Sequence, residues 1–523
     1  MIPVIDLFAG PGGLGEGFST YQIGEKCPFR VKLSIEMDLL AHKTLSLRAF
    51  YRHFIHSGVP VPPEYYLYMA GKTGRGDLFE KYPEAANQAE NEAICAELGG
   101  DKWPDNFFDH KITDALISRK QWLLIGGPPC QAYSLVGRSR MLGALKDKDG
   151  CLVDEGRQFF EDHRHKLYEQ YLRIIAKHWP PVFVMENVKG ILSSKLNGGF
   201  IFPAILKDLR NPSQIAGNNQ SQEHHTYKTV SFVTGREPEK NNNEFLIRAE
   251  EYGIPQARHR VIILGIRDDI HSKINDSILS LQKCGVEITV SDIIGGLPAI
   301  RSEISRRNVT NADGWKDYLE SVRSQSWFNI LDSDVRQIID QSIQKRRKIT
   351  LKMASRDKGR DLPQSFRQWY HDDNLINLSH HEARKHMSSD LYRYLFVSAY
   401  GIARNNSPRL KDFPEELLPN HQNAKPGGEL QNFADRFKVQ LWHKPASTIT
   451  SHISKDGHYF IHPDPVQCRS LTVREAARLQ TFPDNYYFEG NKTQQYHQVG
   501  NAVPPLLARQ LAAIVYEIFL GIA

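Results

Sequence analysis

Short apolar runs recur through the first 270 residues of the chain, separated by helical or turn-rich stretches. They lie at residues 2–5, 31–35, 122–125, 182–185 and 261–264. Runs of this length, bounded by Gly or Pro, are typical of strands that are buried on both faces of a parallel sheet flanked by helices. We therefore predict an α/β fold with a central, mostly parallel sheet.

The pattern changes after residue 297. Apolar runs become sparse, charges cluster and polar stretches such as residues 405–408 interrupt the chain, which predicts a smaller, irregular domain over 298–468. Helical periodicity returns over 469–523, and we expect this end to pack back onto the first domain, 1–297. The stretch at about 50–108 shows little periodicity and is interpreted as an insertion between strands.

Composition changes this picture little. At 523 residues the chain can hold two or more folding units, and its net charge of +6 mildly favours a polyanionic partner. The six cysteines include no Cys-x-x-Cys pair, so we expect neither a disulfide framework nor a metal site. No apolar run approaches the roughly 20 residues that span a bilayer, and Asp6 makes a signal peptide a poor fit. We expect a cytoplasmic protein without membrane contact.

A glycine-rich loop follows the first predicted strand and precedes a helix. It reads Phe8-Ala9-Gly10-Pro11-Gly12-Gly13. Glycines let backbone approach a ligand closely, and the helix start offers free N–H groups. Glu36 ends the next strand, about where an acid binds ribose hydroxyls in dinucleotide-binding folds, and Met37 could pack on an adenine face. A tight turn without a ligand is the alternative. Pro11 between the glycines favours an adenosine compound over a phosphate.

Cys130 follows the strand predicted at 122–125, in Gly126-Gly127-Pro128-Pro129-Cys130-Gln131. The two prolines stiffen the backbone and place the thiol at the carboxyl edge of the sheet, where open α/β sheets bind ligands. A buried, inert cysteine is the alternative. The polar segment that follows, with Gln131 and Ser134, is long enough to close over a substrate, although a plain surface loop has the same composition.

Glu186 ends another apolar strand, so we expect it at the same sheet edge as Cys130. A partly desolvated carboxyl there could keep a raised pKa and donate a proton to a base nitrogen. Arg258 and Arg260 open a further strand, two residues apart and thus on one face, and suit recognition of a carbonyl, carboxylate or phosphate. A solvated strand end is the alternative for all three.

In this order the motifs resemble those of the cytosine-5 DNA methyltransferases, especially the bacterial restriction-modification enzymes. The similarity covers seven segments: Phe8 to Gly13, Glu36, Pro129-Cys130-Gln131, Glu186-Asn187-Val188, Gln256-x-Arg258-x-Arg260, Arg474 to Asp484, and Gln498 to Pro505. The resemblance implies a Rossmann-like methyltransferase domain that uses S-adenosylmethionine, with a target recognition domain over 298–468. Residues 469–523 then carry the last two motifs back to the catalytic domain.

The resemblance also implies roles for particular residues. Cys130 would attack C6 of a flipped-out cytosine, Glu186 would protonate N3, and Arg260, supported by Arg258, would bind the base O2 or hold Glu186. The implied cofactor contacts are Phe8, Gly10, Gly12, Gly13, Glu36, Met37, Asn501 and Ala502. The implied DNA contacts are Gln131, Ser134 and Thr448. Double-stranded DNA is the expected partner of a monomer, with a possible cognate restriction endonuclease.

One family feature is hard to find. Members often carry Asp-Ile-Thr after the third strand, where the acid touches the adenine amino group, but here the order is Lys111-Ile112-Thr113-Asp114. Asp109 and Asp114 both remain candidates for that contact.

Other functions stay open, namely an RNA cytosine-5 methyltransferase, a catalytically inactive DNA-binding regulator and a nicotinamide-dependent oxidoreductase. The long recognition segment favours DNA, and the intact Cys130 and Glu186 favour catalysis. Residues 345–360 include eight basic residues and only one acid. This composition suits contact with phosphates, and a solvated helix face is the alternative.

Overall fold

The computed structural model describes residues 1–117, 119–129, 163–196, 199–214, 224–239, 241–304, 312–345, 362–419 and 436–522. Three of the residues singled out above, Cys130, Gln131 and Ser134, lie outside these ranges, as does the basic stretch 346–360.

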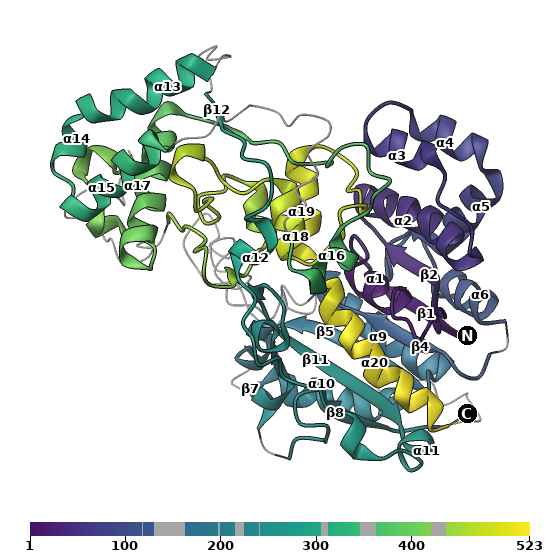
Figure 1. The fold of residues 1–523 in the computed structure, drawn as a ribbon. Coiled ribbons are helices and arrows are strands. Elements are labelled where there is room, and N and C mark those ends of the chain that lie inside the picture. Colours follow the sequence, from purple (N-terminus) through teal and green to yellow (C-terminus); the bar gives the residue numbers. More distant parts are fainter. Residues whose placement is uncertain are drawn as a thin grey trace, which may run out of the picture.

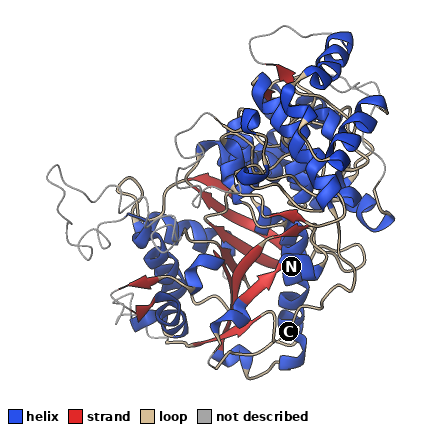
Figure 2. Ribbon diagram, turned by 90° about the vertical axis from the view of Figure 1, so that its left-hand side faces the viewer, coloured by secondary structure: helices blue, strands red, loops and turns tan. Residues whose placement is uncertain are grey.

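An eight-stranded sheet forms the centre of the molecule (Figure 2). Its strand order is β3-β2-β1-β4-β5-β11-β8, with β9 also beside β11. The strands are β1 Ile2–Leu7, β2 Phe29–Glu36, β3 Ala93–Cys95, β4 Leu123–Gly126, β5 Val182–Val188, β8 Tyr227–Ser231, β9 Leu246–Arg248 and β11 His259–Arg267. The five neighbouring strands β3, β2, β1, β4 and β5 are parallel. β11 is antiparallel to its neighbours β5, β8 and β9. The mostly parallel α/β sheet is confirmed; an apolar run does not encode strand direction.

Helices cover both faces of this sheet (Figure 1). Val4 packs with α1 and α20 on one face, and its neighbour Ile5 packs with α6, α9 and α10 on the other. This alternation follows from the two-residue period of a strand. The helices are α1 Gly13–Ser19, α6 Asp105–Leu116, α9 His163–His178, α10 Ile201–Arg210 and α20 Pro505–Leu520. The sheet is therefore a buried middle layer whose strand ends are free to form a site.

The stretch expected to be an irregular insertion is mostly helical. α2 (Leu39–Ser57) leads into three short helices, and then the edge strand β3 pairs with β2. We call the three helices the helical insertion: α3 Pro63–Met69, α4 Arg75–Lys81 and α5 Pro83–Glu92. They share an aromatic core with α2, built around Phe50, Tyr65 and Phe79. The segment is helical rather than irregular, and its helices of seven, seven and ten residues are too short to show a sustained apolar repeat in the sequence.

A second hydrophobic core lies between residues 315 and 468. It is built by helices at the upper left of Figure 1, and so it is more regular than the sequence suggested. The helices are α13 Ala312–Glu320, α14 Ser326–Asn329, α15 Ser333–Gln344 and α17 Ser388–Arg404. The polar stretch 405–408 ends α17, where Asn405 caps the helix in the left-handed conformation.

A third core joins this unit to the sheet domain. The remaining α-helices of the described residues are α11 Asp268–His271, α12 Val290–Ile294, α16 Gln364–Tyr370, α18 Val473–Leu479 and α19 Lys492–Asn501. Two-residue strands pair as β6 (Lys195–Leu196) with β7 (Gly199–Phe200), β10 (Gln256–Ala257) with β14 (Ala446–Ser447), and β12 (Glu303–Ile304) with β13 (Lys385–His386). Among the described residues, only the stretch Lys492–Leu520 is long and apolar enough to cross a membrane, and 61% of its most apolar window is buried in the protein.

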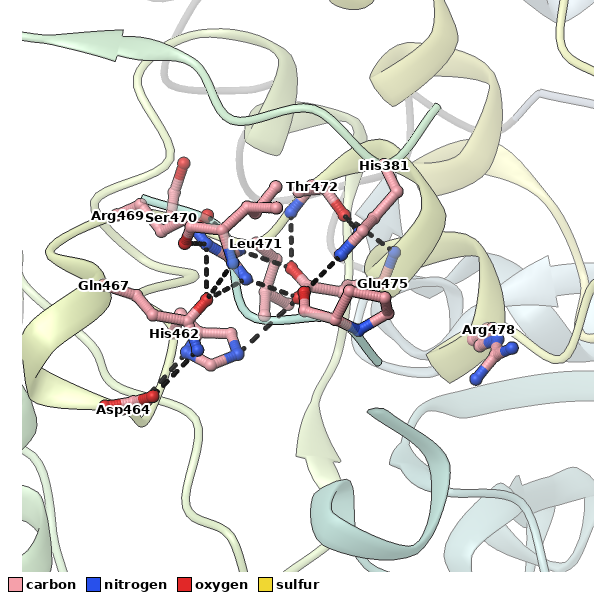
Figure 3. Close-up of polar contacts among 12 residues, drawn as sticks. His381, His462, Asp464, Gln467, Arg469, Ser470, Leu471, Thr472, Glu475 and Arg478 are labelled. Atoms are coloured by element: carbon pink, nitrogen blue, oxygen red, sulfur yellow. Dashed lines mark hydrogen bonds and ion pairs between the residues drawn. The ribbon is translucent and has the colours of Figure 1, made fainter. Parts of the chain in front are cut away.

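A buried ion cluster lies where the second and the third core meet (Figure 3). Arg469 binds the carboxylate of Glu475 through both terminal nitrogens, each at 2.6 Å, and Thr472 donates its backbone N–H to the same carboxylate at 2.7 Å. Burial alone would raise the pKa of Glu475, but Arg469 and His462 lower it well below its usual value. The carboxylate is therefore ionised across the physiological range.

We expect Glu475→Gln to lower the free energy of unfolding by about 3 kcal/mol, because Arg469 would be left buried without its counter-charge. The folded pKa lies below the unfolded one, so this contribution is complete above pH 5 or so and falls as acid protonates the folded carboxylate. Urea unfolding at pH 7 measures the loss. An unchanged midpoint would contradict a stabilising role.

Candidate active site

A pocket of about 380 Å³ lies at the carboxyl edge of the parallel strands. Its walls come from the carboxyl ends of β1 to β5 and the loops that follow them: Phe8, Gly10 and Pro11 after β1, Glu36 at the end of β2 with Met37 and Asp38 after it, Ala96 to Leu98 after β3, Gly127 to Pro129 after β4, and Glu186 to Val188 on β5. Parallel strands bring their carboxyl ends to one edge, which is where such sheets bind ligands. Residues far apart in sequence thus face one cavity.

The glycine loop forms the floor of this pocket. Phe8 and Gly10 both have positive φ, 57° and 56°, and the Gly10 N–H donates to Glu36 Oε2 at 2.7 Å. Gly12 and Gly13, the last two residues of the loop, do not line the pocket. A Cβ on Gly12 would come within 2.7 Å of Leu45, and one on Gly13 would overlap the Val503 carbonyl. At both glycines an added Cβ would point into the protein, so the close packing of the loop requires glycine there, and their expected contact with a cofactor stays a prediction.

Glu36 presents its carboxylate to the cavity while bound by two backbone N–H groups, those of Gly10 and of Asp38 at 2.8 Å. Burial raises its pKa, and the two N–H groups partly offset that shift. Met37, beside it, lines the same wall and has 57% of its surface exposed. A carboxylate next to an exposed thioether suits a ribose beside an adenine ring.

An acidic residue that the sequence did not single out completes this end. Glu97 lines the pocket directly after β3. Asp109, on α6, instead binds Arg173 at 2.9 Å and His178 at 3.1 Å. Asp114 is an exposed residue of the same helix α6. Neither lines the pocket, whereas Glu97 does. β3 is only three residues long, so the sequence did not reveal that Glu97 is the acid that follows the third strand.

At the other end of the pocket, Glu186 lies against the segment that leads to Cys130. A Cβ on Gly127 would be 2.9 Å from Glu186 Oε2, and Asn187 Nδ2 donates to the Pro128 carbonyl at 3.3 Å. Arg260 Nε lies 2.8 Å from Glu186 Oε1 as an ion pair, at an angle outside hydrogen-bond geometry. The expected pairing of Glu186 with Arg260 is therefore present beside Pro129.

Arg258 does not join this pair. It lies at the break between β10 and β11, where the chain does not keep the alternation of one continuous strand. Its side chain is buried and donates to the carbonyls of Ile449 at 2.6 Å and Gly500 at 3.0 Å. Burial and the nearby Arg260 lower its pKa. The expectation that both arginines face the substrate is wrong for Arg258, which ties three distant segments together.

The last wall of the pocket is α19. Asn501 and its neighbour one turn earlier, His497, line the cavity, as expected for Asn501. Ala502 is buried, and its carbonyl accepts a hydrogen bond from Gln480 Nε2 at 2.5 Å, so it supports the wall from behind. The Thr448 hydroxyl donates to the Ala257 carbonyl at 2.5 Å. The expected contact of Thr448 with DNA would have to share or replace that bond.

Comparisons with known proteins identify the family of the chain. The family model for C-5 cytosine-specific DNA methylases matches residues 102–212 and 241–517. The type II methyltransferase M.Bpa9945I of Bacillus paralicheniformis is 32% identical over 99% of both chains. M.AgeI of Thalassovita gelatinovora, also a type II methyltransferase, is 26% identical over 75% of this chain and 82% of its own.

Among solved structures, the Entamoeba histolytica methyltransferase EhMeth aligns over 100% of this chain and 99% of its own, at 12% identity and a TM-score of 0.41. The family match covers well over half of the chain, and the Bacillus relative covers nearly all of it. The chain therefore belongs to the C-5 cytosine-specific DNA methylases and is a DNA (cytosine-5-)methyltransferase of the restriction-modification type.

Proposed function

We propose that this enzyme methylates C5 of one cytosine within a specific duplex DNA sequence, through a covalent adduct with Cys130, and so protects host DNA from a cognate endonuclease. The observation that carries the proposal is the single pocket that Glu36, Glu97 and Glu186 share beside Pro129. One end suits an adenosine compound, and the other holds an acid where the nucleophile must follow.

The residues present fit S-adenosylmethionine, which supplies the electrophilic methyl group when bound. Glu36 would accept hydrogen bonds from the ribose hydroxyls, Glu97 from the adenine amino group, and Met37 would cover the ring face. The described pocket lining contains four acids and no lysine or arginine, which favours a ligand with a positively charged sulfonium and ammonium group. Asn501 would bind the methionine portion.

A cytosine ring is a weak nucleophile at C5. In the proposed mechanism the Cys130 thiolate adds to C6, and Glu186 supplies a proton to N3, so that the ring becomes an enamine. C5 would then take the methyl group, which leaves S-adenosylhomocysteine. Loss of the C5 proton to solvent, expulsion of the thiolate and return of the N3 proton to Glu186 would give neutral 5-methylcytosine. Arg260 keeps the Glu186 carboxyl aimed at the base. The base must leave the stack to reach this pocket, which costs a few kcal/mol.

We propose that the helical unit between residues 298 and 468 is the target recognition domain, with Gln131, Ser134, Thr448 and the basic stretch 345–360 among the DNA contacts. We expect a monomer in the bacterial cytoplasm. The relatives described above are type II methyltransferases, which supports DNA over RNA as the substrate and argues against an inactive regulator.

Bisulfite sequencing of DNA from a host that expresses the chain tests the proposal directly. We expect one cytosine within one recurring sequence to resist conversion. Transfer of labelled methyl groups to tRNA but not to duplex DNA would favour the RNA enzyme. Binding to DNA without transfer to either would favour the regulator.

For the cofactor end, we expect Glu36→Ala to raise the Kd for S-adenosylmethionine on the order of 100-fold, because two hydrogen bonds to a charged acceptor are lost. Calorimetric titration measures this, and DNA affinity should be spared. Glu84→Ala, an exposed glutamate on α5, is the control. A Kd within twofold of the wild-type value would refute the ribose contact.

A further inference from the structure

Two side chains of the helical insertion bind the carboxylate of Glu489, which is far away in the sequence. The Tyr68 hydroxyl of α3 donates to Glu489 Oε1 at 2.7 Å, and Arg75 Nη1 of α4 donates to the same oxygen at 3.0 Å. The Glu489 side chain is only 12% exposed. Arg75 is itself fixed on α2, since it donates to Ser46 Oγ at 3.0 Å and to the Lys43 carbonyl at 3.2 Å.

From Glu489 the contacts continue to the pocket wall. The Glu489 backbone N–H donates to Thr44 Oγ1 at 2.9 Å, and the Thr44 hydroxyl donates to Gln498 Oε1 at 2.7 Å. Gln498 Nε2 donates back to the Glu489 carbonyl at 2.9 Å. Both ends of the Gln498 carboxamide are thus engaged, and a buried side chain held at both ends has little rotational freedom.

Gln498 lies on α19 between His497 and Asn501, and all three line the pocket beside Asp38 and Ala41 of the α2 start. The width of the pocket between α2 and α19 therefore depends on the contacts of Gln498. We infer that the helical insertion positions this wall, with Tyr68, Arg75 and Glu489 acting as positioning residues for the cofactor. The inference rests on the proposed function, in which this pocket binds S-adenosylmethionine.

Burial and the adjacent Glu489 carboxylate raise the pKa of Tyr68, so its hydroxyl stays a neutral donor at physiological pH. The contact therefore holds at working conditions. Loss of one hydrogen bond to a charged group changes an equilibrium constant by roughly tenfold. Because part of that loss is absorbed by relaxation of α19, we expect Tyr68→Phe to raise the Kd for S-adenosylmethionine about five- to tenfold.

The test compares Tyr68 with Tyr82, a second tyrosine that donates to a glutamate and lies between α4 and α5. Tyr82 donates its hydroxyl to Glu64 Oε2, also at 2.7 Å, and neither residue contacts Glu489 among the described interactions. Tyr68→Phe and Tyr82→Phe each delete one hydroxyl from one tyrosine–glutamate bond. We expect only Tyr68→Phe to raise the Kd and the KM for S-adenosylmethionine. kcat at saturating cofactor should stay unchanged.

Arg75 gives a second pair of variants. Arg75→Ala should weaken cofactor binding by a similar factor, and Arg75→Lys should restore part of it, because a lysine can still pair with Glu489. Equal cofactor affinity in wild type, Tyr68→Phe and Arg75→Ala would overturn the inference, as would equal weakening by Tyr82→Phe. If the wild-type enzyme itself fails to bind S-adenosylmethionine, the proposed function fails instead, and the two failures are distinct.

Discussion

Cys130→Ala should abolish methyl transfer, on the order of 10⁴-fold or more, while S-adenosylmethionine still binds with nearly wild-type affinity. Enzymes that lose a covalent nucleophile fall by such factors because no other group can take over its step. Here the lost step is addition to C6, without which C5 carries too little electron density to accept the methyl group. Transfer of tritiated methyl groups into duplex DNA measures the rate, and calorimetry measures cofactor binding.

Cys284→Ala provides the control, since this exposed thiol lies outside the pocket. It should leave the rate unchanged. The central claim of the mechanism would be refuted by turnover in Cys130→Ala. A loss of cofactor binding in that variant would mean instead that the thiol supports the pocket rather than the chemistry.

Glu186→Gln should have the next largest effect, a fall in kcat of about 10²- to 10⁴-fold, the usual contribution of a general acid. An amide keeps the shape of the side chain but cannot supply the proton to N3. Because Glu186 lies at the catalytic end of the pocket, the Kd for S-adenosylmethionine should change little. Single-turnover kinetics at saturating cofactor and DNA separate the chemical step from binding.

Glu250→Gln is a matched control for this variant. Glu250 pairs with His259, the neighbour of Arg260 in β11, at 2.8 Å, and its carboxylate lies outside the pocket. It should retain close to full kcat. A similar loss in both variants would point to distortion of β11 rather than to a missing proton, and full activity in Glu186→Gln would exclude Glu186 as the acid.

Much of the sheet could be predicted because its strands are buried on both faces. β1, β2, β4, β5 and β11 all coincide with apolar runs in the sequence. Three strands escaped notice for physical reasons: β3 and β9 have only three residues each, and β8 reads Tyr-Lys-Thr-Val-Ser, with its lysine exposed. The antiparallel direction of β11 is set by its pairing, which periodicity does not reveal.

The residues of the site could likewise be predicted only in part. The glycine loop, Glu36, Glu186 and Asn501 meet at one pocket, as the order of motifs suggested. The sequence could not show that Arg258 and Arg260 have different surroundings. The Arg258 side chain is held by the carbonyls of Ile449 and Gly500, which are far away in the sequence. Glu97 carried a usable signal, an acid just past a short strand, but that strand was hidden in a stretch of helices.

One feature of the pocket bears on how the enzyme is made in the cell. The loop after β1 is synthesised well before α19, and both line the same cavity. A nascent chain therefore has no complete cofactor site until translation has passed α19. We therefore expect a chain that stops before α19 to be inactive.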